Sequence, residues 1–119
     1  MIHEEYDAVY NYFSDIDVVN IEISQMYNHG FSVELGFGII LDFDENYLPV
    51  NLEILSASKV INVDKKMLCN PNGDVKIYVG EDIISVEIVF KFENNDETLK
   101  FKSLNDLSVP VSQTNFSLV

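Results

Sequence analysis

Hydrophobic and polar residues alternate with a period of two along much of the chain, the pattern of strands that bury one face. Apolar side chains occupy odd positions in residues 31–43, which predicts one strand, and even positions in residues 48–54. A four-residue loop, Asp44-Glu45-Asn46-Tyr47, would place both apolar sets on the same face. We therefore predict a β-hairpin over Phe37–Leu55. The predicted cross-strand pairs are Phe43–Leu48, Leu41–Val50, Ile39–Leu52 and Phe37–Ile54.

The opposite face of this hairpin is mostly polar and is expected to meet water. Because Pro49 has no amide proton to donate, the second strand of the hairpin is expected at a sheet edge. The residues of this face are Gly38, Ile40, Asp42, Pro49, Asn51 and Glu53.

Two further hairpins follow from the same pattern. Residues 84–92 alternate against Leu99 and Phe101 around the turn Asn94-Asn95-Asp96-Glu97, which sets Phe92 opposite Leu99 and Phe90 opposite Phe101. The turn signal Pro71-Asn72-Gly73-Asp74 is expected to join strands at 66–70 and 75–79.

Three shorter segments complete the prediction. Residues 18–23 form a strand candidate after the turn at 14–17, and residues 56–61 fit a single helical turn. A helix is also possible near the N-terminus, where apolar residues share one helical face. The residues of that face are Ile2, Tyr6, Val9, Tyr10 and Phe13.

A chain of 119 residues supports one core, so residues 1–119 are expected to form a single domain. The expected class is mainly β, or α+β with one short N-terminal helix. Its antiparallel hairpins would form a small sandwich or a partly open barrel.

Charge narrows the range of functions. The chain has a net charge of −13 and seven lysines without an arginine, which opposes direct binding to nucleic acid and favours a basic protein partner. No segment has the ~20 consecutive apolar residues of a membrane-spanning helix, and the acidic start does not fit a secretory signal. These features predict a cytoplasmic protein that does not bind membranes.

The most distinctive polar motif is Asp42-x-Asp44-x-Asn46 followed by Glu53, which has the spacing of an EF-hand calcium loop. Tyr47 stands where that loop needs glycine, and the flanking segments read as strands. In the predicted register Glu53 lies opposite Gly38, roughly 13 Å along the strand from Asp42, so the two carboxylates would not share an ion.

Asp42, Asp44 and Glu45 remain as a candidate acidic tip that would bind a metal weakly or contact a basic partner. Turn formation and solvation are the simpler interpretation of its residues and of Asp15 and Asp17.

No reaction mechanism emerges from the remaining reactive residues, and we predict no catalytic residue, metal ligand or cofactor site. Cys69 is interpreted as a small apolar residue. His3 is near the N-terminus and His29 is in an expected loop, and neither has a companion at metal-ligand spacing. Several phenylalanines are in the phase of a buried face and are expected to pack in the core. These are Phe37, Phe43, Phe90, Phe92 and Phe101.

Two stretches resemble the family called Domain of Unknown Function 2283, small prokaryotic proteins with the patterns YDxExDxLYI and ILDYDExGxxVGIEILDASK. The stronger match is Ile40-Leu41-Asp42-Phe43-Asp44-Glu45 followed by Val50-Asn51-Leu52-Glu53-Ile54-Leu55-Ser56-Ala57-Ser58-Lys59. The looser match consists of Tyr12, Asp15, Asp17, Val18, Val19 and Ile21. The resemblance covers residues 12–61, and residues 62–119 form an additional β-rich half. Phe13, Tyr47 and Ser56 depart from the pattern at polar or turn positions while the apolar residues are kept.

This resemblance implies a β-rich fold and no established activity. Some members are thought to be encoded beside small toxin-like proteins, which implies an antitoxin-like inhibitor as one candidate. From the residues themselves we predict a non-enzymatic protein-interaction module that forms a homo-oligomer or binds another protein, basic in character. The alternative from another class is a small metal-dependent hydrolase that uses surface carboxylates.

Overall fold

Nine strands and two short helices make up most of residues 3–23 and 26–119, the part of the chain that the computed structural model describes. The expectation of a mainly β fold is confirmed. The elements are β1 (His3–Phe13), β2 (Val18–Glu22), β3 (His29–Glu34), β4 (Ile39–Asp44), β5 (Pro49–Ile54), α1 (Ala57–Ile61), the 3-10 helix η1 (Lys65–Leu68), β6 (Asn72–Val79), β7 (Ile83–Lys91), β8 (Asp96–Leu104) and β9 (Ser112–Leu118).

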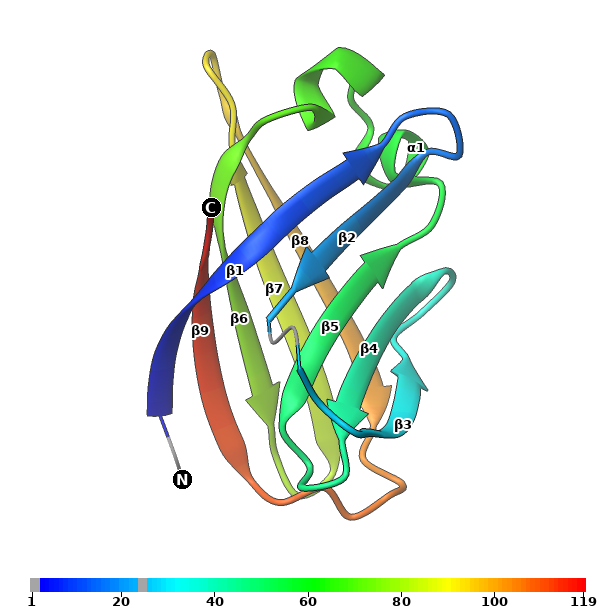
Figure 1. Cartoon of the computed structure of the whole chain (residues 1–119), viewed down its shortest axis with the longest axis vertical. Helices are drawn as coiled ribbons and strands as arrows, with labels where there is room; N and C mark the ends of the chain where they lie inside the picture. Colours follow the sequence, from blue (N-terminus) through cyan, green and yellow to red (C-terminus); the bar gives the residue numbers. More distant parts are fainter. Residues whose placement is uncertain (1–2, 24–25) are drawn as a thin grey trace.

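The strands are hydrogen-bonded in the order β3-β4-β5-β2-β1-β9-β6-β7-β8. Strand β1 is shared between two sheets, because residues 9–13 pair antiparallel with β2 and residues 3–8 pair parallel with β9. We call β3, β4, β5, β2 and residues 9–13 the first sheet, and residues 3–8 with β9, β6, β7 and β8 the second sheet. The first sheet lies in front of the second in Figure 1, and together they form a nearly closed barrel with β3 and β8 as its two edges.

The core lies between the two sheets and receives side chains from both. Leu41 and Leu52 enter it from the first sheet, and Ile77, Ile88 and Phe90 enter it from the second. All five are at most 1% exposed. Such burial removes apolar surface from water and is the main stabilising contribution in a fold of this kind.

The predicted hairpin over Phe37–Leu55 is confirmed as β4 and β5, but its predicted register is wrong by two residues. Leu41 lies opposite Leu52 rather than Val50, and Ile39 lies opposite Ile54. The amide of Asp44 bonds to the carbonyl of Leu48 (2.8 Å), which shortens the loop by one residue. A bulge beyond Asp42 adds a second residue of offset, so the apolar side chains still face the core.

Strand β5 does not lie at an edge, contrary to the prediction from Pro49, because it pairs with β4 and with β2. Pro49 is its first residue and lies beside the bulge, where a missing amide proton is tolerated.

The prediction of one strand through residues 31–43 is wrong. The chain turns back within it, so that β3 and β4 pair with Phe31 opposite Phe43 and Val33 opposite Leu41. Gly36 and Gly38 have φ angles of 76° and 79°, which glycine adopts at little cost. Phe37 lies between them and is 97% exposed, so its assignment to the core is also wrong.

The second predicted hairpin is confirmed as β7 and β8, with a register four residues from the predicted one. Phe90 lies opposite Glu97 and Ile88 lies opposite Leu99. A hydrogen bond from the amide of Phe92 to the carbonyl of Asn95 (3.0 Å) closes the turn earlier than predicted. The strand therefore resumes at Asp96. Phe92 is half-buried against the core and stacks on Phe90.

The hairpin predicted around Pro71-Asn72-Gly73-Asp74 is absent from residues 66–79 as the structure describes them. Residues 65–68 form η1, and Gly73 lies within β6, paired with Phe90 of β7. A Cβ atom at Gly73 would collide with the carbonyl oxygen of Val89, so close approach of two strands explains this glycine.

The N-terminal helix prediction is also wrong, because residues 3–13 form the shared strand β1. Pairing with both β2 and β9 outweighs the helical spacing of its apolar residues. The strand expected at 18–23 is confirmed as β2, and the helical turn expected at 56–61 is confirmed as α1. Ile2 lies outside the described residues.

No helix in residues 3–23 and 26–119 is long and apolar enough to cross a membrane. The sequence analysis separates a part that resembles a known family, which ends at residue 61, from an additional β-rich half. That boundary falls at the end of α1, where the chain passes from the first sheet towards the second.

Candidate functional site

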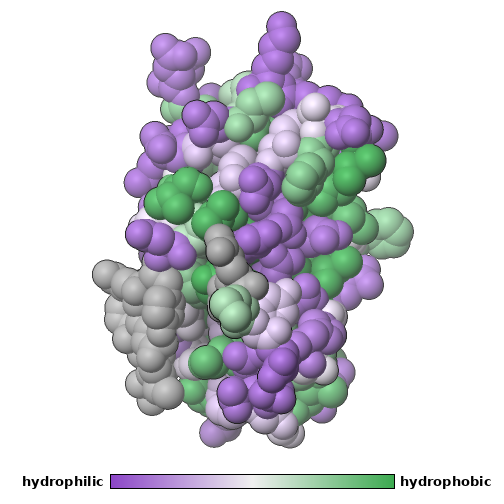
Figure 2. All heavy atoms as spheres, viewed as in Figure 1, coloured by the Kyte–Doolittle hydropathy of each residue, from purple (hydrophilic) through white to green (hydrophobic). Residues whose placement is uncertain are grey.

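The outer face of the first sheet, turned away from the core, gathers most of the polar residues that the sequence analysis singled out. Alternation along each strand places a row of side chains from four strands next to one another there. Figure 2 views the molecule from the side of the first sheet, and hydrophilic residues gather on the face that it shows. We define the outer face by Asn20, Glu22, Ser32, Glu34, Asp42, Asn51 and Glu53.

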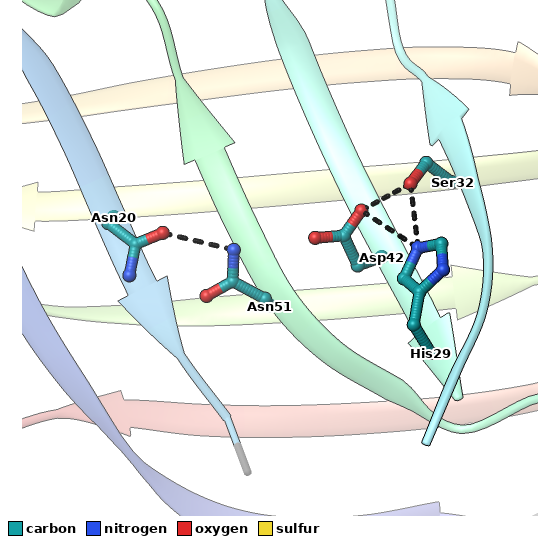
Figure 3. A network of polar contacts seen from close by, with 5 residues as sticks. All are labelled: Asn20, His29, Ser32, Asp42 and Asn51. Atoms are coloured by element: carbon teal, nitrogen blue, oxygen red, sulfur yellow. Dashed lines mark hydrogen bonds and ion pairs between the residues drawn. The ribbon is translucent and has the colours of Figure 1, made fainter. Parts of the chain in front are cut away.

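Two asparagine side chains join β2 and β5 on this face. The Nδ2 atom of Asn51 donates to the Oδ1 atom of Asn20 at 3.0 Å (Figure 3). Asn51 is only 9% exposed although it lies on the outer face, and this bond meets part of its hydrogen-bonding need. The pair therefore fixes a polar centre in the sheet at a place where the two strands meet.

A second polar group lies beside this pair, on β3 and β4. The hydroxyl of Ser32 donates to Asp42 Oδ1, and His29 Nε2 lies 3.1 Å from the Ser32 oxygen and 3.9 Å from Asp42 Oδ1 (Figure 3). His29 is thus the first residue of β3 rather than a loop residue. The other carboxylate oxygen of Asp42 points towards Asn51.

The residue types serine, histidine and aspartate suggest a catalytic triad, but the geometry does not fit one. In a triad the aspartate holds the second ring nitrogen of the histidine and the serine donates to the histidine. Here Ser32 donates directly to Asp42, and the same nitrogen of His29 faces both partners. The arrangement can hold a cation or a hydrogen-bond donor, but it does not activate the serine.

Two carboxylates of the outer face have no partner. Within the described part of the chain, the side chains of Glu22 and Glu53 make no hydrogen bond or ion pair, and both residues are only partly exposed. None of the residues that define the face is a lysine. Residues 1–61 contain eleven of the twenty acidic residues and one of the seven lysines, Lys59. Three of these acids, Glu4, Glu5 and Asp7, belong to the second sheet. The strands of the first sheet contain five acidic residues and no lysine, whereas the strands of the second sheet contain seven acidic residues and four lysines, so the first sheet carries the more negative net charge.

The acidic tip does not converge on a common point. Asp44 Oδ1 accepts from the amides of Asn46 (2.8 Å) and Leu48 (3.0 Å), which is the turn role expected of it. Glu45 accepts from Asn28 (3.0 Å), while Asp42 binds Ser32. No group of three or more histidine, cysteine, aspartate or glutamate residues is placed to hold a metal ion in residues 3–23 and 26–119.

Glu53 lies nearer to Asp42 than the predicted register implied. Glu53 lies opposite Ile40 rather than Gly38, and Ile40 is two residues from Asp42 along β4. The two carboxylates therefore share the outer face, where a partner with several positive charges could contact both.

The sequence analysis did not predict a polar cluster that lies at the β1–β2 turn, where the turn meets α1. Asp17 accepts hydrogen bonds from the Tyr12 hydroxyl (2.7 Å), the Ser58 hydroxyl (2.7 Å) and the Ser58 amide (3.0 Å). The carbonyl of Asp17 also accepts from the amide of Ala57 (2.9 Å). Asp17 thereby ties the turn to α1, which is more than the turn role expected of it.

These contacts change the acidity of both side chains. Desolvation raises the pKa of Asp17, but the hydrogen bonds from Tyr12 and Ser58 and the charge of Lys65 outweigh it, and the net pKa is lowered. Desolvation and the hydrogen bond to Asp17 raise the pKa of Tyr12 to about 12. Asp17 is therefore held in its charged form by the fold.

The remaining reactive residues lie apart from the outer face. Cys69, interpreted from the sequence as a small apolar residue, follows η1 and is exposed rather than packed in the core. Its thiol lies 3.7 Å from the carbonyl of Lys65. His3 belongs to β1.

Comparisons of this chain with family models, with curated proteins and with solved structures find no match. The resemblance of residues 12–61 to Domain of Unknown Function 2283 stays a prediction.

Proposed function

We propose that this protein is a non-enzymatic protein-interaction module whose outer face on the first sheet binds a basic surface of another protein. The observation that carries the proposal is the row of polar side chains across β2, β5, β4 and β3. Carboxylates and carboxamides lie together in this row without a lysine.

Charge favours this role in two ways. A field of one sign across a face raises the rate at which an oppositely charged protein associates. The carboxylates of Glu22 and Glu53 are available for direct ion pairs, since no group among the described residues already binds them. The same field would repel nucleic acid and anionic lipid.

The fixed polar centre adds specificity to this attraction. Asn20 and Asn51 hold each other, and Ser32 holds Asp42, so their remaining hydrogen-bonding atoms are already oriented before a partner arrives. Oriented groups lose less conformational entropy on binding. An acidic antitoxin-like inhibitor of a basic protein is a special case of this function. The acidic composition and single cysteine fit work in the cytoplasm.

Neutralising two carboxylates of the face should weaken binding to a basic ligand. The variant E22Q/E53Q removes two charges and preserves the shape of the side chains. With an unstructured peptide of alternating lysine and serine as the probe, we expect the dissociation constant to rise about fivefold at low salt. This corresponds to two exposed ion pairs of about 0.5 kcal/mol each. Fluorescence anisotropy of the labelled peptide measures it.

A matched control separates the face from net charge. The variant E81Q/E93Q also removes two charges, both at exposed positions outside the first sheet. It should leave the dissociation constant within about twofold of that of the unaltered protein. Equal weakening in both variants, or no binding of the peptide by the unaltered protein, would contradict the proposal.

A further inference from the structure

Strand β8 presents a long unpaired edge. Among the strands of residues 3–23 and 26–119 it comes last in the order and pairs with β7 alone, in a register without a bulge from Ile83–Leu104 to Lys91–Asp96. Its side chains alternate between exposed and half-buried along all nine residues. Regular edges of this length are templates for pairing with another strand, and proteins usually cover or interrupt them.

The other edge, β3, is protected and also limits how much of β8 is free. β3 has six residues and a bulge between His29 and Phe31. A pocket of about 240 Å³ lies between the two edges and is lined by residues 32–34 of β3 and by Ser103 and Leu104 of β8. The last residues of β8 therefore face β3 across a hollow. Glu97, near the start of β8, lines a second hollow with Ser58 and Met67. No described strand pairs with residues 96–102 on the side away from β7.

We propose that two copies of this chain form a symmetric dimer through β8, with residues 96–102 of one copy antiparallel to residues 96–102 of the other. A twofold axis then passes beside Leu99, which faces Leu99 of the second copy. The dimer joins two second sheets into one continuous sheet. This surface is separate from the outer face of the first sheet, so the dimer and the proposed binding of a basic protein can each fail independently.

Charge complementarity selects this register. It places Asp96 of each copy opposite Lys102 of the other, which gives two cross-strand ion pairs on the exposed side of the sheet. Lys102 has no ion-pair partner within the part of the chain that the structure describes. The exposed side chains Thr98 and Lys100 then face each other across the dimer.

The neighbouring registers are less favourable. A shift of two residues in one direction brings Lys100 opposite Lys100 of the second copy, where like charges repel. A shift in the other direction brings Asp96 opposite Lys100. That lysine already lies 3.8 Å from Glu87 of its own chain, and Lys102 is left without a carboxylate. On the core side, the proposed register covers the half-buried Leu99 and Phe101.

Charge reversal tests the dimer directly. Sedimentation equilibrium should give the mass of two chains for the unaltered protein. D96K and K102E should each raise the dimer dissociation constant about tenfold or more, since each turns two attractive pairs into repulsive ones. The double variant D96K/K102E exchanges the two charges and should restore the dimer. K66E, which makes the same charge change as K102E on η1, should leave the dimer unaffected.

Three results would overturn the dimer. These are a monomeric unaltered protein at concentrations up to about 1 mM, a double variant as weak as the singles, or a K66E variant as weak as K102E. Circular dichroism of each variant shows whether its monomer has kept the fold.

Discussion

Replacing Phe43 with alanine should lower the free energy of unfolding by about 3–5 kcal/mol, the range for a large aromatic removed from a packed core. Phe43 is 0% exposed and stacks on Phe31, with ring centroids 4.9 Å apart. The matched change at Phe37 should alter stability by less than about 0.5 kcal/mol, because that ring is 97% exposed. Equilibrium unfolding in urea measures both.

The two phenylalanines are a sharp test because they share one phase of the sequence pattern. Both stand at odd positions in residues 31–43. The chain reversal at Gly36 and Gly38 leaves Phe43 buried in the core and Phe37 exposed in the turn. Similar losses for the two variants would mean that Phe37 is buried and that residues 31–43 form the single strand first predicted.

Removing the Asp17 carboxylate should have the second largest effect. We expect D17A to lower the free energy of unfolding by about 2–3 kcal/mol, because the Tyr12 hydroxyl and the hydroxyl and amide of Ser58 lose a charged acceptor, which leaves only the backbone bond from Ala57 between α1 and the β1–β2 turn. D15A changes a neighbouring exposed acid of the same turn and should cost less than about 0.5 kcal/mol. If D15A and D17A lowered the free energy of unfolding equally, the turn would depend on its negative charge rather than on the hydrogen bonds of Asp17.

The lowered pKa of Asp17 fixes the direction of a pH effect. In the unfolded chain this carboxyl titrates near pH 3.9, and in the folded chain it titrates below its usual range. Between the two values the unfolded state binds more protons, so acid favours unfolding. The stability from Asp17 is fully present above the unfolded pKa and is lost as the pH falls through the folded pKa.

A comparison with D17N isolates this contribution from those of the other acids. Asparagine tolerates the φ angle of 55° at this position and replaces the titrating carboxylate by a neutral amide of nearly the same shape. The difference in stability between the unaltered protein and D17N should be constant near pH 7 and should shrink below about pH 4. A difference that stays constant or grows on acidification would contradict the assignment.

The alternation of apolar and polar residues predicted where strands lie, but it did not show how many strands one stretch contains. In residues 31–43 every odd position is apolar, and this pattern is expected both for a single strand and for a hairpin whose turn preserves the phase. The pair Gly36 and Gly38 carried the missing information, because two positive φ angles so close together favour a reversal.

Hairpin registers were predictable only as to which face is buried. Offsets of two residues for Leu41 and four for Leu99 keep the same side chains on the core side, so the apolar pattern cannot distinguish them. The turns decide the offset, and they depend on local bonds such as that from the Asp44 amide to the Leu48 carbonyl. The parallel pairing of β1 with β9 joins the two ends of the chain and has no local signal.

The polar residues were partly predictable. Their place on one face of the hairpin followed from alternation, but the row across β2, β5, β4 and β3 depends on strand order. The cluster at Asp17 had one signal. Tyr12, Asp17 and Ser58 all belong to the stretches that resemble a family pattern, and the fold brings them together. Their hydrogen bonds hold the β1–β2 turn against α1.

The central claim is that the outer face of the first sheet is the binding surface for a basic partner. An amide NMR spectrum of the unaltered protein, titrated with the peptide of alternating lysine and serine at low salt, tests it most directly. We expect the largest shifts to cluster on β2, β5 and β4, around Glu22, Glu53 and Asp42. Shifts that cluster on the second sheet, or that spread evenly over all exposed acidic residues, would contradict it.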